Sequence, residues 1–394
     1  MARVLIGFGE ALAAPEAYFS LRAAGHDVRV FTRKGRQPPS LIRRLPVGEP
    51  ILLPAPEDNA EAATEALACA VEAIDAEVLL PLDDTSLALV AGAAPLAAVA
   101  GATGPQADIA LDKERQTALA AESGFELLPT VVARSRAEVE TALHDRIPFP
   151  AIAKPARAVQ PWKSGLRKGE AHFLETPADV AALPANVCLP LLVQPLRMGT
   201  GEGIFGFATQ SGVTAWSAHR RLRMMNPHGS GSSACVSMAP GPELRKAAQR
   251  FVEIAEWRGP FMIELLRLDD GAAAFMEFNG RLRGSTALAR RSGLEYPAWA
   301  VGQALDPAFA PDSPAVQAGL RVRHLARDLL RVAFVLRGPR TDFHRRTWPG
   351  AWGAIAAALS PGERVEFYDY DPAHPRFFLQ EAWDMLRDRA GRRG

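Results

Sequence analysis

The chain has 394 residues, of which 48% are hydrophobic and 23% charged, with a formal net charge of +1. This composition is typical of a soluble globular protein of several domains, and the near-zero charge gives no global field that would attract nucleic acid or a membrane surface. Its three cysteines, Cys69, Cys188 and Cys235, form no CxxC pair, which argues against a disulfide framework or zinc site and favours a reducing, cytoplasmic location.

Two segments resemble targeting or membrane signals. The first residues, "MARVLIGFGEALAAPE", have a basic residue and an apolar run, but Glu10 interrupts the run and a buried strand explains it better than a signal peptide. Residues 86–104 carry no charge, yet their Pro, Gly and Ala content favours a packed helix over a membrane span. We therefore expect neither secretion nor a membrane-spanning segment.

The N-terminal region alternates between strand and helix patterns. "RVLIGF" predicts a parallel-type strand, the next residues predict a helix that ends near Gly25, and "VRVFTR" predicts a second strand. A helix over residues 61–75 leads into "EVLLPLDD", a buried strand with Asp83 and Asp84 at its carboxyl end. Residues 1–108 are therefore predicted to form a doubly wound α/β domain with a parallel sheet.

After this domain the pattern changes to short helices and antiparallel strands. A helix stops at Gly124, "FPAIAKPA" and "CLPLLVQPL" predict strands, and a turn near Ser211-Gly212 joins two more. A helix over residues 243–257 precedes an antiparallel pair around Asp270-Gly271. The tail, residues 305–394, is rich in Arg and punctuated by Pro.

"FMEFNGRLRGS", residues 275–285, has a polar side chain at every second position, where a buried strand would carry apolar residues. On a strand these positions share one face, and they are Glu277, Asn279, Arg281, Arg283 and Ser285. The series therefore predicts a functional site.

The preceding turn sets the partner of this stretch. Asp270-Gly271 is a strong signal for a two-residue type I′ loop, which places Glu264 directly opposite Glu277. Two carboxylates this close repel each other unless a cation lies between them. A solvated hairpin edge with chance acids is the alternative, which the apolar flanking residues disfavour. A one-residue slip would separate the pair.

The sequence thus predicts a metal site of Glu264, Glu277 and Asn279. Mg²⁺ prefers carboxylate and amide oxygens, and with few protein ligands it completes its shell with waters and phosphate oxygens. Arg281 and Arg283 follow where guanidinium groups would neutralise phosphate or carboxylate charge. We therefore interpret the hairpin as a metal–phosphate site.

"GTGEGIFG" carries Gly201, Gly203 and Gly206 at the GxGxxG spacing of dinucleotide-binding proteins. The following residues read as strands, so no helix N-terminus would be available for a pyrophosphate. The N-terminal "GFGEAL" lacks the third glycine as well. A nicotinamide enzyme is therefore disfavoured.

Other basic residues stand at element ends. Lys113 opens a helix after Asp112, a suitable N-cap, and Lys154 ends an apolar strand. "AHRRLRMMNPHGSGSSA" adds Arg220, Arg221 and Arg223 before a Gly/Ser-rich turn. Taken singly, each lysine is more often a surface residue, and a solvated basic loop is the alternative for the arginine segment.

Taken in order, these segments resemble the ATP-grasp superfamily of carboxylate–amine and carboxylate–thiol ligases. The ordered set is "LDK…TALAAESGFELLPT", "FPAIAKP", "LLVQP…GTGEG", "HRRLR…GSGSS" and "FMIELL…FMEFNGRLRGS". The resemblance covers about residues 1–300 and implies an α/β and α+β architecture, with an N-terminal doubly wound parallel-sheet domain followed by a two-lobed ATP-grasp fold. The implied domains are 1–108 (pre-ATP-grasp), 109–190 (small lobe), 191–304 (large lobe with the metal site) and 305–394 (a C-terminal extension packed on the ligase domain).

The resemblance implies a role for each matching residue. Residues that match the nucleotide site are Lys113 and Lys154 for the phosphates, Gln194, Pro195 and Leu196 for adenine, and Glu202 for the ribose. Residues that match ligands of Mg²⁺ (or Mn²⁺) are Glu264, Glu277 and Asn279. Residues that match catalytic positions are Arg281, next to the transferred phosphate, with Arg283 and Arg221. Candidate substrate residues are Arg223, Ser285, Asp83 and Asp84.

Two features depart from the family pattern. The loop over residues 156–169 lacks the usual glycine-rich lid and keeps only Ser164-Gly165. Pro195 stands where the family often has Glu, which leaves the Leu196 N–H and the Pro195 carbonyl to contact adenine.

The function implied is ATP-dependent joining of a carboxylate to an amine, with ADP and phosphate released. The alternatives are a non-catalytic ATP-binding regulatory module and a small-molecule kinase. The implied partners are ATP and a small carboxylate and amine, amino acids among the candidates, without nucleic acid or membrane. The substrates and the oligomeric state, a homodimer included, are left open by the sequence.

Overall fold

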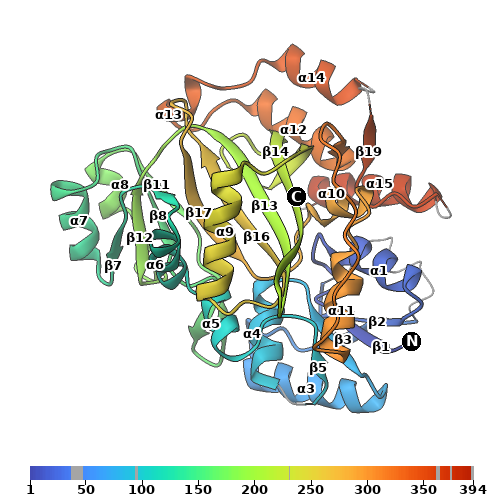
Figure 1. Ribbon diagram of the computed structural model, residues 1–394. Helices are drawn as coiled ribbons and strands as arrows, with labels where there is room; N and C mark the ends of the chain where they lie inside the picture. Colours follow the sequence, from blue (N-terminus) through green and yellow to red (C-terminus); the bar gives the residue numbers. More distant parts are fainter. Residues whose placement is uncertain (37–47, 94–95, 230, 361–363, 373–374, 392–394) are drawn as a thin grey trace.

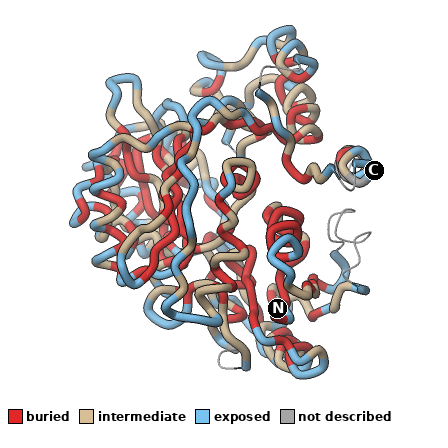
Figure 2. Tube along the Cα trace, turned by 45° about the vertical axis from the view of Figure 1, so that its right-hand side comes forward, coloured by how far each residue is buried: buried red, intermediate tan, exposed pale blue. Residues whose placement is uncertain are grey.

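The computed structural model describes residues 1–394 except 37–47, 94–95, 230, 361–363, 373–374 and 392–394. Figure 1 shows the N-terminal α/β region at the lower right, a small lobe at the left, and a large twisted sheet between them. The C-terminal segment lies along the upper edge of that large sheet. Figure 2 shows that buried residues follow the strands, whereas connecting segments are mostly exposed.

The N-terminal region is a parallel sheet in the order β3-β2-β1-β4-β5. Its strands are β1 (Arg3–Gly7), β2 (Asp27–Arg33), β3 (Ile51–Leu53), β4 (Val78–Pro81) and β5 (Ala98–Val99). Its helices are α1 (Ala14–Ala23), α3 (Ala60–Ala73) and α4 (Asp84–Ala93). The predicted doubly wound domain is confirmed, although residues 86–104 contain a shorter helix than expected, followed by β5. The strand order reverses between β1 and β4, and Asp83 and Asp84 lie at this switch point.

The small lobe is an antiparallel sheet in the order β11-β8-β12-β7. Its elements are β7 (Val131–Ala133), α7 (Arg136–Asp145), β8 (Ala151–Pro155), β11 (His172–Leu174), α8 (Pro177–Ala181) and β12 (Leu191–Pro195). Because β12 lies between β8 and β7, the predicted boundary at residue 190 falls one strand too early.

The large sheet runs in the order β19-β18-β15-β14-β13-β16-β17-β6. Its strands are β6 (Glu126–Leu127), β13 (Thr200–Thr209), β14 (Gly212–Met224), β15 (Ser232–Met238), β16 (Gly259–Arg267), β17 (Ala273–Asn279), β18 (Arg321–Arg323) and β19 (Val365–Phe367). One face carries Ile204, Ile263 and Leu265, which pack in one core with Phe251 of α9 (Pro242–Ile254). The other face carries Phe205 and Met262 in a core shared with the N-terminal sheet.

The remaining elements connect or cover these sheets. They are α5 (Gly104–Leu111), α6 (Lys113–Ser123), β9 (Gln160–Trp162), β10 (Gly165–Arg167), α10 (Thr286–Arg291), α11 (Tyr296–Leu305), α12 (Leu325–Arg337), α13 (Asp342–Arg345), α14 (Ala351–Leu359) and α15 (Pro375–Gly391). Within the part of the chain that the structure describes, every helix is too short or too polar to cross a bilayer.

The β16–β17 hairpin brings Glu264 opposite Glu277, as predicted. Its loop is not the two-residue type, however. The Leu268 N–H donates to the Ala272 carbonyl oxygen at 2.8 Å, so the loop has one residue more, with Gly271 at φ +89°. This shifts the pairing by one residue, and a bulge between the Glu264 and Leu265 pairings shifts it back. The predicted pairing is therefore correct although the predicted turn is wrong.

Candidate functional site

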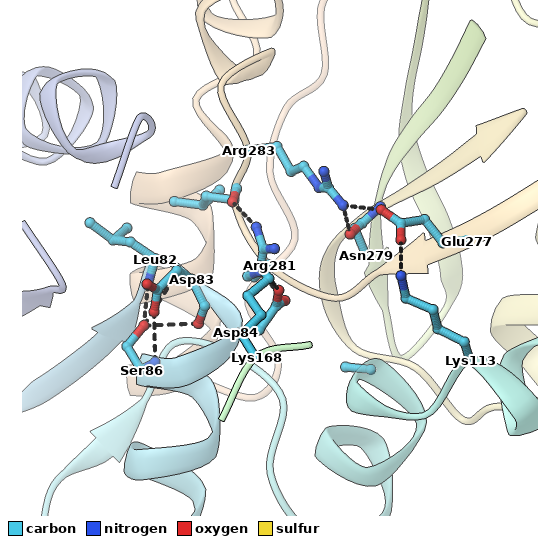
Figure 3. Close-up of polar contacts among 12 residues, drawn as sticks. Leu82, Asp83, Asp84, Ser86, Lys113, Lys168, Glu277, Asn279, Arg281 and Arg283 are labelled. Atoms are coloured by element: carbon cyan, nitrogen blue, oxygen red, sulfur yellow. Dashed lines mark hydrogen bonds and ion pairs between the residues drawn. The ribbon is translucent and has the colours of Figure 1, made fainter. Parts of the chain in front are cut away.

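Glu264 and Glu277 lie on the face of the large sheet that is turned toward the N-terminal region, and basic groups surround both. The Arg221 Nη2 is 2.9 Å and the Arg283 Nη1 3.2 Å from the Glu264 Oε1. Arg283 also donates hydrogen bonds to the Glu277 carboxylate and the Asn279 Oδ1. Figure 3 shows Arg283 pointing toward Asn279 and Glu277, and Lys113 reaching Glu277 from below. The predicted metal ligands therefore converge, and cations hold their oxygens in this structure.

Strand β17 ends at Asn279, so the alternation predicted through Ser285 stops there. A Cβ at Gly280 would lie 2.1 Å from the Trp257 Cη2, which makes a side chain at this position incompatible with the packing. Beyond it, Arg281 turns toward the N-terminal region, where its Nε donates to the Asp84 Oδ1 at 2.5 Å (Figure 3). Arg283 turns back to the hairpin carboxylates. The two arginines therefore face different partners instead of sharing a strand face.

Lys113 reaches the same carboxylates from the first turn of α6. The Asp112 side chain accepts from the Glu114 and Arg115 N–H groups, which confirms it as the N-cap. This start places the Lys113 Nζ 2.9 Å from the Glu277 Oε2. Lys113 is therefore not an isolated surface lysine: its ion pair with Glu277 makes it part of the site.

Lys154 lies on β8 of the small lobe, and its pKa responds to the hairpin carboxylates. Burial and then the neighbouring Lys113 lower the pKa of Lys154, Glu277 and Glu264 raise it, and the resulting pKa is about 8. A lysine with this pKa is mostly protonated at neutral pH. Its charge is therefore incompletely balanced by the protein, which favours an anionic ligand.

The electrostatics confirm that Glu277 is ionised. Burial raises its pKa, but Arg283 and Lys113 more than offset this and hold the pKa well below its usual range.

Among the described residues, no group of three or more His, Cys, Asp or Glu side chains could hold a metal ion. Two carboxylates with one amide oxygen nevertheless suit Mg²⁺ that takes its other ligands from phosphate and water. The excess of cations over these two carboxylates also fits a Mg²⁺–polyphosphate ligand.

Arg281 and Arg283 line two cavities. The first, of about 150 Å³, also contains Lys113, Lys168, Glu277 and Asn279. The second, of about 260 Å³, lies between the large sheet and the N-terminal region, and its other lining residues include Arg221, Glu264 and Ser285. Arg281 and Arg283 thus lie between the two cavities and can contact a group bound in either of them.

Asp83 and Asp84, two candidate substrate residues, have protein partners. The Asp83 Oδ1 accepts from the Ser86 N–H at 2.7 Å, and its Oδ2 pairs with Arg33 at 3.0 Å. Asp84 holds Arg281 and, at 3.1 Å, the Lys168 Nζ. Burial raises the Asp84 pKa, but Arg281 and Lys168 hold it well below its usual value. Asp84 therefore orients Arg281 in this structure.

Glu202 and Arg223 are not brought to the site. Glu202 pairs with Leu265, one position from the pairing of Gly203 with Glu264, so it faces the other side of the sheet. There its carboxylate binds Arg267 at 2.7 Å. Arg223 forms a two-bond ion pair with the buried Asp328 of α12, at 3.0 and 2.7 Å. Both side chains are therefore held in ion pairs away from Glu264 and Glu277 in this structure, and their ribose and substrate roles stay predictions.

The predicted adenine hinge is ordered by its own hydrogen bonds. The Gln194 side chain donates to the Thr130 Oγ1 at 2.7 Å. The Leu196 N–H donates to the Pro150 carbonyl oxygen at 2.8 Å, so this donor is engaged, contrary to the expectation that it contacts adenine. Leu196 borders a cavity of about 350 Å³ next to the β16–β17 loop. The hinge keeps its predicted place beside a cavity, but adenine contacts would need another backbone group.

The loop over residues 156–169, which departs from the usual glycine-rich lid, contains a β9–β10 hairpin docked on the N-terminal region. The Leu166 N–H donates to the Pro56 carbonyl oxygen at 2.7 Å, and the Ala60 N–H donates to the Ser164 carbonyl oxygen at 2.9 Å. A Cβ at Gly165 would lie 2.2 Å from the Glu57 carbonyl oxygen, so only glycine allows this approach. The hairpin therefore bridges the small lobe and the N-terminal region, and Lys168 and Gly169, which follow it, line the smaller cavity.

Sequence reasoning missed two residues of the site, Lys168 and His219, and the contact between Asp84 and Arg281. The Lys168 ammonium donates to Asp84, which is 84 positions away in the sequence, and Arg281 donates to Asp84 across a separation of 197 positions. His219 lines the larger cavity and is buried. No local pattern marks any of these contacts, although the carboxyl ends of β1 and β4 are where a doubly wound sheet is expected to meet ligands.

Comparisons with known proteins identify the fold. No protein-family model matches the chain, and no curated protein matches it by sequence. An L-amino acid ligase from Bacillus licheniformis is similar in structure, with a TM-score of 0.61, 15% identity and coverage of 78% of this chain and 76% of the other. A biotin carboxylase–ATP complex from Campylobacter jejuni is similar with a TM-score of 0.62 and 14% identity, over 81% of this chain and 74% of the other. An N5-carboxyaminoimidazole synthetase from Staphylococcus aureus complexed with ADP is similar with a TM-score of 0.58 and 11% identity, over 80% of each chain. The chain has the ATP-grasp fold.

Proposed function

We propose that the protein is an ATP-dependent ligase that joins a carboxylate to an amine through an acylphosphate. The observation that carries this proposal is the position of Arg281 and Arg283, which line both the cavity with Lys113 and Glu277 and the cavity with Arg221 and Ser285. A phosphoryl group bound in the first cavity and a carboxylate bound in the second would meet at these guanidinium groups. The structural similarity to an L-amino acid ligase, a biotin carboxylase and an N5-carboxyaminoimidazole synthetase supports this proposal.

The chain supplies charge and position for phosphoryl transfer. Lys113 and Lys154 would bind the phosphate oxygens, and Glu264, Glu277 and Asn279 would hold Mg²⁺, which neutralises charge on the phosphates when bound. Arg283 would then release the hairpin carboxylates and neutralise anionic substrate oxygens. These groups suffice because phosphoryl transfer depends mainly on positioning and electrostatic stabilisation.

The bond changes are as follows. A carboxylate oxygen of the substrate attacks the γ-phosphorus, and the bond from that phosphorus to the β–γ bridging oxygen breaks, which releases ADP. The amine nitrogen then attacks the acyl carbon, phosphate leaves, and the amine proton goes to phosphate or solvent. Arg281 would neutralise the transferred phosphoryl group in the first step. The β9–β10 hairpin would exclude water that hydrolyses the acylphosphate.

The proposal predicts that ADP and phosphate are released together and only when both a carboxylate and an amine are present. The measurement is ADP and phosphate formation with Mg·ATP and pooled amino acids and small carboxylates, with mass-spectrometric detection of the condensed product. ADP formation with a stable phosphorylated product would contradict a ligase and indicate a kinase. Nucleotide binding without ADP formation from any mixture would indicate a non-catalytic module.

A further inference from the structure

His219 occupies an unusual position in the larger cavity. It lies on β14, on the same sheet face as Glu264, and only 1% of its surface is exposed. Neither ring nitrogen has a hydrogen-bond partner among the residues that the structure describes. Buried polar side chains are nearly always hydrogen-bonded, so a ring with two unpaired nitrogens at a cavity wall needs an explanation.

Two glycines of β13 create the space that His219 and Arg221 occupy. A Cβ at Gly203 would lie 3.1 Å from the His219 Nε2, and a Cβ at Gly201 would lie 2.7 Å from the Arg221 Cδ. The register places Gly203 between His219 and Glu264. These glycines of the GxGxxG-like segment therefore have a role other than dinucleotide binding: they let both side chains lie across the strand.

The surroundings keep the His219 ring neutral. Burial, and after it the charges of Arg221 and Arg283, lower its pKa to about 3. A neutral imidazole offers one N–H donor and one acceptor nitrogen. The Nε atoms of Arg221 and Arg283 likewise have no hydrogen-bond partner in the described part of the chain. The two His219 ring nitrogens and the two arginine Nε atoms are thus available to hydrogen-bond a ligand in this cavity.

The cavity is also partly apolar. Its lining includes Leu12, Met262 and Leu282 together with the polar residues. A volume of about 260 Å³ accommodates a small organic acid with an aliphatic chain. One carboxylate has only two oxygens, so it leaves part of the polar set unpaired unless the ligand carries a second polar group.

We propose that His219 is a substrate-binding residue that selects carboxylates with a second hydrogen-bonding group, hydroxyl or amino, close to the carboxylate. Residues two apart on a strand are separated by roughly 7 Å, so a group bound at His219 lies within a few bonds of a carboxylate held by Arg221. A site built to hydrogen-bond such a group rejects analogues that lack it. This inference rests on the proposed function, because that function puts a carboxylate in this cavity.

The test uses three ligands with one carbon skeleton: leucine, 2-hydroxy-4-methylpentanoate and 4-methylpentanoate. Their binding to the full chain is measured by the shift in thermal unfolding, with Mg²⁺ and a non-hydrolysable ATP analogue present. The wild type is expected to bind at least one of the two substituted acids about tenfold or more tighter than 4-methylpentanoate. His219→Leu is expected to remove this preference, and His219→Gln, which keeps a donor and an acceptor, to retain part of it.

His219→Leu has a second expected signature. Removing an unpaired buried polar group should raise the melting temperature of the unliganded protein by about 1–2 °C. His344 serves as the control because it is buried but hydrogen-bonded to Thr341 at 2.7 Å, outside the cavity. His344→Leu is expected to lower the melting temperature and leave the ligand preference unchanged.

Two results would overturn the inference. One is a His219→Leu protein that keeps the preference of the wild type. The other is a wild type that binds the nucleotide analogue but prefers neither substituted acid, or binds none of the three acids. Failure to bind the nucleotide analogue would instead count against the proposed function, so the two failures are distinguishable.

Discussion

Glu277→Gln is expected to lower the rate of ADP formation by about 100- to 1000-fold. Glu277 is the carboxylate that Lys113 and Arg283 share, and it lies directly opposite Glu264. An amide keeps the shape but removes the negative charge that would hold a divalent cation. The measurement is ADP formation over a range of Mg²⁺ concentrations, where the variant should need more Mg²⁺ for its residual rate.

Glu126→Gln is the matched control for this change. It is the same Glu-to-Gln substitution on β6, the strand that pairs with β17, and its side chain is exposed. Glu126 lines none of the cavities next to the hinge or the hairpin carboxylates. This variant should retain wild-type turnover. Normal ligation by Glu277→Gln would contradict the assignment of Glu277 as a metal ligand.

Arg281→Lys is expected to lower kcat by about 100- to 1000-fold while changing the affinity for Mg·ATP by less than about threefold. Lysine keeps the charge but loses the planar fork whose Nε binds Asp84. Burial lowers the pKa of Arg281, and Asp84 raises it by more, so the guanidinium stays charged beside both cavities. Turnover and calorimetric titration with the nucleotide separate the two effects.

Arg290→Lys controls for the burial of an arginine. The Arg281 and Arg290 side chains are each 11% exposed, but Arg290 binds Glu16 and Glu295 outside both cavities. Its replacement should affect stability and not kcat. Asp84→Asn, which loosens Arg281, should lower kcat by about tenfold. An Arg281→Lys protein with wild-type kcat would exclude Arg281 from phosphoryl transfer.

Local features made the pairing of Glu264 with Glu277 and the α6 lysine predictable from the sequence. The alternation of Glu277 and Asn279 and the nearby turn fixed which acids meet, because register in a short hairpin depends on few residues. The predicted loop length was wrong, and the bulge that compensates for it lies in "FMEF", a segment without a glycine to mark it. An N-cap aspartate likewise placed Lys113 at a helix start.

Contacts between distant segments were not predictable. Glu202 was placed by its match to a motif, and only the pairing of β13 with β16 reveals that it faces away from Glu264. Arg223 forms its ion pair with Asp328 of α12, which lies 105 positions later in the sequence. Such contacts depend on how sheets and helices pack, which local propensity does not encode. The same limit applies to the Asp84–Arg281 pair.

The most direct measurement of the central claim follows oxygen from the carboxylate to the released phosphate. Pooled amino acids and small carboxylates, labelled with ¹⁸O in their carboxyl groups, are incubated with the protein and Mg·ATP, and the phosphate is analysed by mass spectrometry. An acylphosphate intermediate predicts one ¹⁸O atom in each phosphate released during ligation, because the carboxylate oxygen that attacks phosphorus leaves with it. Phosphate without label, formed while a condensed product accumulates, would contradict the mechanism.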